Sequence, residues 1–323
     1  MNDITVSVIT TAYNHEKYIR QTIESIVSQE TDFNFELLIN DDCSTDGTAD
    51  IIREYEAKYP DIVHPIYQTE NQYSKGVNIP KLLIDRAQGE HVAFCEGDDY
   101  WCDNTKLQRQ VDKLYECPEY AACVHQTTEL NCLTGEKRQM SARKGNGVIG
   151  FEDVIQGGNK AFQMSSLLVK RELLKDAELD KLQSISKAGD YPLSMFLTLK
   201  GGIYYIDRTM SVYRAYSSED SWTLYIRKHP EAAVKYNQEM IKILELIDAM
   251  SRQQYTGLIQ ERIRAHRYDM LKNQNSRETF SGKEFKELFK QESSYMKCLL
   301  IAKAYCPKRL WELLKRLKNG STA

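Results

Sequence analysis

The chain has 323 residues, of which 28% are charged and 41% are hydrophobic, and its formal net charge is −3 at pH 7. These values are ordinary for a globular protein, and the slightly acidic balance gives no reason to expect nucleic acid as a partner. No uncharged apolar run approaches the roughly 20 residues that a membrane-spanning helix needs. Nucleic-acid-binding and membrane-spanning classes are therefore not expected.

The eight cysteines form no Cys-x-x-Cys pair and share no zinc-type spacing with histidine. Three of them lie in or beside apolar segments, as buried free thiols do. The first residues show neither a basic region ahead of the apolar run nor a small-residue cleavage pattern, so no signal peptide is expected. We therefore expect a reducing, cytoplasmic compartment and no disulfide framework.

Strands and helices alternate over the first hundred residues. Short apolar runs predict strands at residues 6–10, 35–39, 62–67 and 91–95. Helices are predicted between them from a 3.6-residue period, and Asn14 is the expected cap of the first one, at residues 18–27. This alternation predicts βαβ units and a mostly parallel α/β sheet with helices on both faces and right-handed crossovers.

The predicted elements in the rest of the chain are mostly shorter. Thr105 and Gln108 stand at capping-box spacing and predict a helix start, with Asp103 and Asn104 assigned to capping. The remaining predicted elements are short strands within 120–170, a helix that opens at 187–193 and runs to 199, strands at 203–206 and 211–216, and helices at 231–272 and 281–291.

The composition changes after Trp222. We expect an α/β domain at residues 1–222, with halves at 1–103 and 104–222, and a helical C-terminal extension at 223–323. Residues 295–318 of this extension are basic and amphipathic. Such a helix can lie on an anionic membrane surface, or it can pack its leucines and tryptophan on the protein with its lysines in water. Both interpretations stay open.

Acidic residues follow the fourth predicted strand. Glu96, Asp98 and Asp99 come directly after its apolar run, where ligands bind in open α/β sheets. Crowded carboxylates repel one another, so a cation or a hydrogen-bonding ligand would neutralise them. The alternative is a solvated loop whose acids cap the next helix. Thr11 and Asp42 are expected at the same sheet edge, and this favours a functional site.

Four motifs, each after a predicted strand, resemble those of the family 2 glycosyltransferases of the GT-A type. They are Val8-Ile-Thr-Thr-Ala-Tyr-Asn14, Asn40-Asp-Asp-Cys-Ser-Thr-Asp-Gly-Thr48, Glu70-Asn71 and Glu96-Gly-Asp-Asp-Tyr-Trp101. The resemblance covers roughly residues 4–222. It implies a Rossmann-like GT-A sheet and an inverting sugar transfer from a nucleotide sugar.

For the acidic loop, the resemblance implies a metal site. Asp99 would bind the metal and Asp98 the ribose or the metal, while Glu96 and Gly97 stand where the family more often begins its D-x-D pattern. A cation that bridges the phosphates stabilises the departing nucleotide diphosphate. An all-oxygen site with room for water suits Mn²⁺ or Mg²⁺.

The resemblance also implies contacts to the nucleotide. Thr11, Ala12 and Tyr13 would line it, and Asp42 would accept the N3–H of uracil. Lys75 would meet a phosphate. The alternatives are an Asx turn for Asp42, core packing for Tyr13 and a solvated position for Lys75.

Asp190 matches the family position of the general base, which takes the proton of the acceptor hydroxyl. Its alternative is helix capping, since Asp is a good N-cap and Pro192 suits a first turn. The sequence departs from the family at Tyr216, where a histidine often completes the metal shell. Trp101 and Trp222 are candidate surfaces for stacking a sugar.

The leading hypothesis is an inverting transfer of a hexose or N-acetylhexosamine from a UDP-sugar to a glycan or lipid-linked acceptor in cell-surface polysaccharide assembly. The expected location is the cytoplasm, with peripheral contact at the inner face of the plasma membrane through residues 295–318 as one interpretation. The alternative is a non-catalytic nucleotide-sugar or glycan-binding module on the same fold. A phosphatase or receiver domain fits worse, because neither acidic pattern is present.

Overall fold

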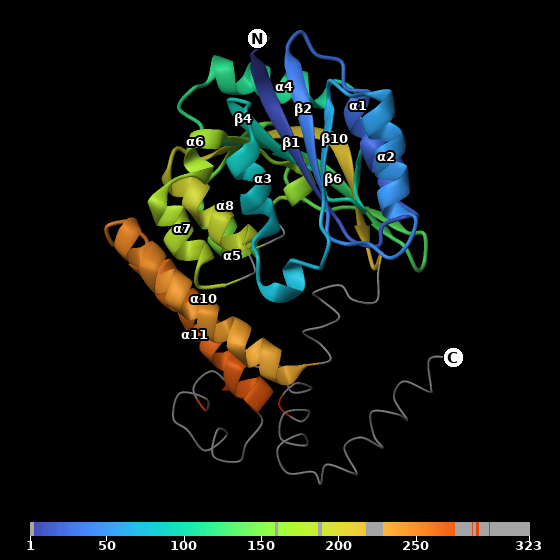
Figure 1. Cartoon of the computed structure of the whole chain (residues 1–323). Helices are drawn as coiled ribbons and strands as arrows, with labels where there is room; N and C mark the ends of the chain where they lie inside the picture. Colours follow the sequence, from blue (N-terminus) through green and yellow to red (C-terminus); the bar gives the residue numbers. More distant parts are fainter. Residues whose placement is uncertain are drawn as a thin grey trace. The chain divides into compact units, whose positions relative to one another are not determined.

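The computed structural model describes residues 3–158, 161–186, 189–217 and 229–274, and also residues 286, 289, 290 and 297. The chain divides into two compact units, Met1–Glu219 and Asp220–Ala323. Figure 1 colours the chain along its sequence and labels its elements. Among the helices that the structure describes, none has both the length and the apolar composition needed to span a bilayer.

The first unit opens with alternating strands and helices, as predicted. These elements are β1 (Ile4–Ala12), α1 (Ile19–Val27), β2 (Asn34–Asp41), α2 (Thr48–Lys58), β3 (Val63–Tyr67), the short 3-10 helix η1 (Tyr73–Lys75), α3 (Ile79–Arg86) and β4 (His91–Phe94). Their bounds lie within a few residues of the predicted ones, because the apolar periods that define them are unambiguous.

The rest of the unit contains shorter elements. They are β5 (Tyr100–Trp101), α4 (Lys106–Glu116), β6 (Ala122–Asn131), β7 (Lys137–Gln139), β8 (Gly147–Ile149), α5 (Phe151–Gly157), the 3-10 helix η3 (Met164–Ser166), β9 (Leu168–Lys170), α6 (Arg171–Leu174), α7 (Ala177–Gln183), α8 (Asp190–Leu199) and β10 (Ile203–Ala215).

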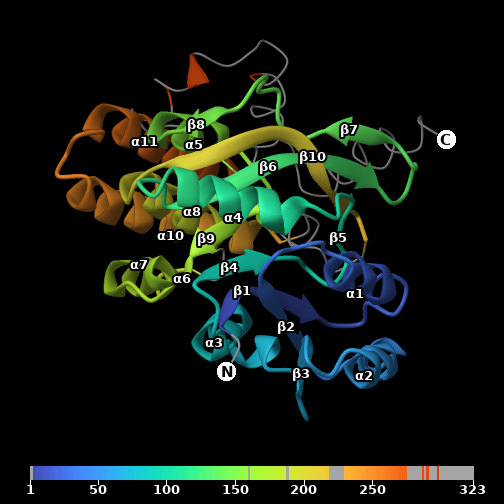
Figure 2. The same ribbon diagram turned by 90° about the horizontal axis from the view of Figure 1, so that it is seen from above.

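The described strands form one sheet with the order β3-β2-β1-β4-β9-β6-β10-β5, while β7 pairs with β6 and β8 pairs with β10. β1, β2, β3 and β4 pair in parallel. β9 is antiparallel to both β4 and β6, so β6 runs in the same direction as β4, and β10 is parallel to β6. Figure 2 shows β6 and β10 side by side. The predicted α/β sheet is confirmed: β1, β2, β3, β4, β6 and β10 run in one direction, while β5, β7, β8 and β9 pair antiparallel to their neighbours.

β6 and β10 continue beyond the end of β4. Leu168 of β9 pairs with Ala93 near the end of β4 and with Cys123 near the start of β6. From that level, β6 runs on to Asn131 and stays paired with β10 as far as Ala215. The loop that follows β4 therefore has a two-stranded extension of the sheet beside it.

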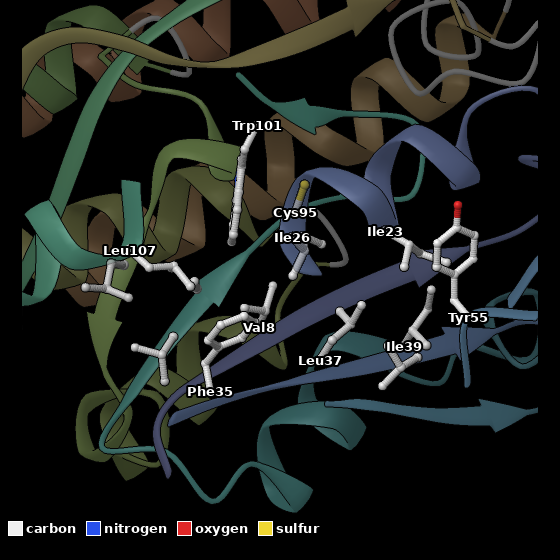
Figure 3. Packing of buried hydrophobic residues seen from close by; sticks show 14 of the residues in the cluster. Val8, Ile23, Ile26, Phe35, Leu37, Ile39, Tyr55, Cys95, Trp101 and Leu107 are labelled. Atoms are coloured by element: carbon white, nitrogen blue, oxygen red, sulfur yellow. The ribbon is translucent and has the colours of Figure 1, made fainter. Parts of the chain in front are cut away.

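The main hydrophobic core lies on one face of this sheet. Val8 of β1 and Leu37 of β2 are fully buried and belong to one cluster with Ile23 of α1, Tyr55 of α2 and Leu107 of α4 (Figure 3). Full burial of such side chains contributes about 1.5–3 kcal/mol each. α3 packs on β1 and β2 with buried side chains that lie outside this cluster, so helices cover both faces.

The predicted capping of two helices was wrong, although α1 and α4 begin within a residue of the predicted positions. Asn14 has a left-handed backbone with φ of 55°, and the N-cap of α1 is Tyr18. No capping box forms at Thr105, because the Gln108 side chain bonds to Asp112 and to the backbone N–H of Asp32. Asp103 forms a turn just before the helix, where its Oδ1 atom accepts from the backbone N–H of the N-cap residue Thr105 at 2.9 Å, and its Oδ2 atom pairs with Arg208, so its role is not capping alone.

The two short strands predicted at residues 203–206 and 211–216 are one strand, β10. Register shifts between Ile206 and Thr209 and between Thr209 and Ser211 keep it paired with β6. The polar residues in this stretch suggested an interruption between two strands. Bulges allow such a stretch to remain in the sheet.

The second unit contains a helical hairpin of α10 (Pro230–Met250) and α11 (Thr256–Gln274). The predicted helical region at 231–272 is therefore divided, at a turn in which Arg252 and Gln253 have φ of 51° and 65°. Buried apolar residues of both helices form its core, including Ile243, Ile247 and Ile263. The predicted helix at 281–291 and the tail at 295–318 fall largely outside the described residues.

Candidate active site

The site is built where the parallel strands end. Ala12 of β1 pairs with Asp41 of β2, and the backbone N–H of Asp42 donates to the Ala12 carbonyl at 2.9 Å. The backbone N–H of Gly97 donates to the Thr11 carbonyl at 3.0 Å. The loops after β1, β2 and β4 therefore meet at one sheet edge, as the sequence predicted.

Asp99 faces the protein interior. It is 0% exposed, its Oδ1 atom accepts the backbone N–H of Arg214 at 2.9 Å, and its Oδ2 atom accepts the Ser165 hydroxyl. Burial, and then the charge of Asp98, raise the pKa of Asp99 to about 7, although the two hydrogen bonds act in the opposite direction. Asp99 therefore fastens the acidic loop to β10 and η3. The metal contact predicted for Asp99 stays a prediction, because both oxygens already accept hydrogen bonds from buried protein groups.

Asp98 and Glu96 are the carboxylates left at the surface of the loop. Asp98 is partly exposed, and its Oδ2 atom accepts the Ser217 hydroxyl at 2.6 Å. Solvent reaches Glu96, whose carboxylate accepts no hydrogen bond from the described residues, although its backbone carbonyl accepts the Asp99 N–H at 2.9 Å. Desolvation by the surrounding protein, followed by the charges of Asp98, Asp99 and Asp190, raises the pKa of Glu96 well above its usual range. A bound cation would relieve this repulsion.

Arg214, near the end of β10, holds the acidic loop in place. Its guanidinium lies 4.9 Å from the Tyr18 ring centre and 4.6 Å from that of Tyr100, and the residue is only 6% exposed. It donates to the carbonyl of Asp98 and to Oε1 of Gln21. Arg214, Ser165 and Ser217 were not predicted as site residues. In the sequence, only the Val-Tyr-Arg segment pointed to this part of the site. The contacts of Ser165 and Ser217 with the acidic loop depend on strand pairing between distant segments.

His15 also lies at the site and was not predicted as a site residue from the sequence. A Cβ atom placed on Gly97 would lie 2.6 Å from Nδ1 of His15, so the imidazole packs directly on the acidic loop. Burial lowers the pKa of His15, although Asp98, Asp46 and Asp41 act in the opposite direction. The signal available in the sequence was its position immediately after Tyr13 and Asn14.

Asp190 is the first residue of α8, whose N-cap is Gly189. Its carboxylate makes no capping bond and accepts no hydrogen bond from the described residues. Burial raises the pKa of Asp190, although solvent reaches the residue, and its charge acts on Glu96. Within the described part of the chain, the carboxylate predicted as a base thus has no hydrogen-bond partner, and its charge reaches the acidic loop. Its catalytic role stays a prediction.

The predicted nucleotide contacts lie along the same edge. Asp42 is 4% exposed, and its two carboxylate oxygens accept the backbone N–H groups of Gln72 at 2.8 Å and Tyr73 at 3.0 Å. It therefore anchors η1, and its contact to a base stays a prediction. Ala12 is buried and can contribute its backbone, while Thr11 is partly buried and the Tyr13 side chain is 44% exposed.

The stacking role predicted for Trp101 is wrong. Its side chain is 3% exposed, its Nε1–H donates to the Ser165 carbonyl at 2.9 Å, and the Lys106 Nζ atom lies 4.0 Å from the centre of its ring. Figure 3 shows Trp101 among the core residues. Trp222 lies outside the described residues. Lys75 is half exposed and paired with Glu70, so its phosphate contact stays a prediction.

The residues present fit a cation that is shared with a ligand. Among the described residues, no three His, Cys, Asp or Glu side chains gather into a complete metal site. Mg²⁺ usually binds through one or two carboxylates, substrate phosphates and water, and does not need an all-protein cage. Asp98, with Glu96 beside it, matches this pattern, and the fully buried Asp99 matches it less well.

The chain is similar in sequence to several other proteins. Uncharacterized protein Rv1520 of Mycobacterium tuberculosis is 33% identical over 216 residues, which cover 66% of this chain and 59% of that protein. The UDP-Glc:alpha-D-GlcNAc-diphosphoundecaprenol beta-1,3-glucosyltransferase WfaP of Escherichia coli is 38% identical over 107 residues, 33% of this chain and 39% of that protein. The chain thus spans about three-fifths of the length of the first relative and less of the second.

The fold also has solved counterparts. S. aureus TarS 1-349 in complex with UDP matches with a TM-score of 0.58 and 19% identity, covering 93% of this chain and 79% of that chain. Together with the sheet order and the covering helices, this identifies the GT-A fold. The model of glycosyl transferase family 2 matches residues 7–176, just over half of the sequence. The chain therefore belongs to glycosyl transferase family 2.

Proposed function

We propose that the chain transfers a hexose or N-acetylhexosamine from a UDP-sugar to a glycan or lipid-linked acceptor in cell-surface polysaccharide synthesis, with inversion at the anomeric carbon. The observation that carries this proposal is the meeting of the loops after β1, β2 and β4 at one sheet edge, with Glu96 and Asp98 at its surface. The Asp190 carboxylate, which has no hydrogen-bond partner among the described residues, acts on Glu96 through its charge. The names of WfaP and of the TarS complex support a UDP-linked donor and, for WfaP, a lipid-linked acceptor.

The donor half of the proposal concerns residues 1–103. Asp98 and Glu96 would hold a divalent cation, Mn²⁺ or Mg²⁺, which would neutralise charge on the departing diphosphate. Thr11, Ala12 and Tyr13 would line the nucleotide. Asp42 would meet the base through the lone pairs that its bonds to Gln72 and Tyr73 leave available.

The acceptor half concerns residues 104–222. The acceptor hydroxyl oxygen attacks the anomeric carbon of the sugar while the bond from that carbon to the diphosphate oxygen breaks. The hydroxyl proton moves to the Asp190 carboxylate. Because burial raises the pKa of Asp190, its carboxylate is a stronger base than an ordinary aspartate.

The direct test is mass-spectrometric detection of donor hydrolysis and transfer with a panel of nucleotide sugars, with and without EDTA. Wild type, Asp98→Asn and Asp190→Asn are compared on the full chain. We expect UDP-sugar turnover that EDTA and Asp98→Asn suppress, and an inverted anomeric product. Failure of wild type to bind or turn over any nucleotide sugar would overturn the proposal. Saturable UDP binding without turnover on any acceptor would favour the non-catalytic module.

We further propose that residues 295–318 bring the chain to the cytoplasmic face of the membrane through their basic charge. Full-length protein and a variant truncated after Tyr295 are compared for sedimentation with vesicles that contain anionic lipid. We expect weaker vesicle binding and unchanged donor hydrolysis in the truncated variant. Equal vesicle binding would show that this segment does not serve as a membrane contact.

A further inference from the structure

The loop that carries His15 is fixed by hydrogen bonds from its backbone. The N–H groups of Asn14 and His15 donate to Ser44 Oγ at 2.9 Å and to Thr48 Oγ1 at 2.8 Å, and that of Glu16 donates to Asp46 at 3.1 Å. The loop after β1 is thus held on the loop after β2. Nδ1 of the ring makes no hydrogen bond within the described residues, so this backbone and the packing on Gly97 position the imidazole.

The ring rests against the residue that precedes Asp98. A Cβ atom on Gly97 would lie 2.6 Å from Nδ1 of His15 and 2.8 Å from the Thr11 carbonyl, so only glycine allows this approach. Nδ1 is buried there and has no hydrogen-bond partner in the described part of the chain. A residue whose backbone is so firmly held, and whose ring is still unpaired, is suited to a ligand.

The two ring nitrogens differ in what they can do. A proton on Nδ1 would point into the Gly97 backbone, where no acceptor is available, and an unpaired buried donor is costly. The proton therefore belongs on Nε2, which is not among the buried unpaired atoms. His15 thus presents one N–H donor at the same edge as Asp98.

We propose that the Nε2–H of His15 donates a hydrogen bond to the diphosphate of the bound nucleotide sugar. This inference rests on the proposed function, which puts the diphosphate beside Asp98. Negative charge grows on the diphosphate as the sugar leaves, so this hydrogen bond strengthens in the transition state and assists departure. His15 is then both a binding residue and a contributor to kcat.

The test measures the Kd of UDP by titration calorimetry on the full chain, for wild type, His15→Ala, His15→Gln and His15→Asn. The amide nitrogen of Gln can take the place of Nε2, whereas that of Asn corresponds to Nδ1 and would face Gly97. We expect a roughly ten- to hundred-fold weaker Kd for Ala and Asn, the range for a hydrogen bond to a charged group. His15→Gln should stay within a few-fold of wild type.

Uridine, which lacks the diphosphate, is the control ligand. The affinity of the protein for uridine should be the same in wild type and His15→Ala. His64→Gln, an exposed position on β3, is the control variant. Equal UDP affinity in wild type and His15→Ala would overturn the inference about His15 and leave the proposed function untouched. Equally weak binding in Ala and Gln would show that the ring acts only by packing, and an equal loss with uridine would move the contact to the nucleoside. If wild type itself does not bind UDP, the proposed UDP donor fails instead.

Discussion

The backbone N–H of Arg214 donates a 2.9 Å hydrogen bond to Oδ1 of Asp99, and this bond joins the end of β10 to the acidic loop after β4. The Ser165 hydroxyl occupies the second oxygen of the same carboxylate. Asp99 therefore connects three segments that are distant in the sequence. The acid that most resembles a metal ligand in the sequence is a structural organiser of the site.

Asp99→Asn is expected to keep stability and most of the activity. The amide oxygen can accept from Arg214, and the amide nitrogen can donate to the Ser165 hydroxyl. Asp99→Ala leaves two buried groups unpaired and should cost roughly 1–3 kcal/mol for each. Urea unfolding and donor hydrolysis measure the two effects. An inactive Asp99→Asn protein with wild-type stability would instead assign Asp99 to the metal.

Asp190→Asn is expected to lower kcat about 10²–10⁴-fold while the Kd of UDP stays unchanged. The base works only when ionised, so activity falls as the pH drops through its pKa. Because burial raises this pKa, the acidic limb of the kcat profile should lie above the usual range of an aspartate near 4. Asp180→Asn, which removes a surface pair with Lys81, is the control. An unchanged kcat in Asp190→Asn would exclude its role as base.

Gly97→Ala is expected to displace the acidic loop. The added methyl group would lie 2.6 Å from His15 Nδ1 and 2.8 Å from the Thr11 carbonyl, closer than such contacts can be. We expect loss of UDP binding or of stability, measured by calorimetry and thermal unfolding. Gly257→Ala is the control, because nothing lies within 4 Å of its added Cβ. Wild-type behaviour of Gly97→Ala would mean that the loop relaxes readily and is not preorganised.

Lys106→Met is expected to stabilise the protein in a pH-dependent way. Lys106 is 0% exposed, its Nζ has no hydrogen-bond partner among the described residues, and burial lowers its pKa to about 7 from 10.5. Between these values the unfolded chain binds more protons, so this lysine makes wild-type stability rise with pH. The Met variant should be more stable than wild type near neutral pH.

The advantage of Lys106→Met should shrink by about 2–3 kcal/mol between about pH 7 and about pH 9, since one pKa unit corresponds to about 1.4 kcal/mol. Urea unfolding at both pH values gives the difference. Lys17→Met, at an exposed position, should show no such trend. A constant difference between wild type and Lys106→Met would show that Lys106 stays charged in the fold.

The strands, helices and edge of the sheet could be predicted from local patterns. Val8 and Leu37 lie in apolar runs that leave no alternative to buried strands, and the acids after β4 must then lie at the carboxyl edge. This reasoning predicted that Asp98 and Asp190 serve one site although they are far apart along the chain, and the charges of both act on Glu96.

The orientation of side chains within the acidic loop could not be predicted. Asp98 and Asp99 are adjacent and chemically identical, and only the pairing of β5 with β10 decides which one turns inward. Trp101 is buried for the same reason, because it pairs with Ser211 of β10. Contacts with strands more than one hundred residues away cannot be predicted from local sequence patterns.

The extension of β6 and β10 beyond the end of β4 bears on which changes of length the chain can tolerate. Arg214, which donates to Asp99 and to the carbonyl of Asp98, pairs with Leu130 of β6, and Leu130 pairs with Lys137 of β7. The hairpin of β6 and β7 and the acidic loop are therefore linked through neighbouring strands. Insertions or deletions between β6 and β7 are expected to disturb the loop that carries Asp98, although the two segments are distant along the sequence.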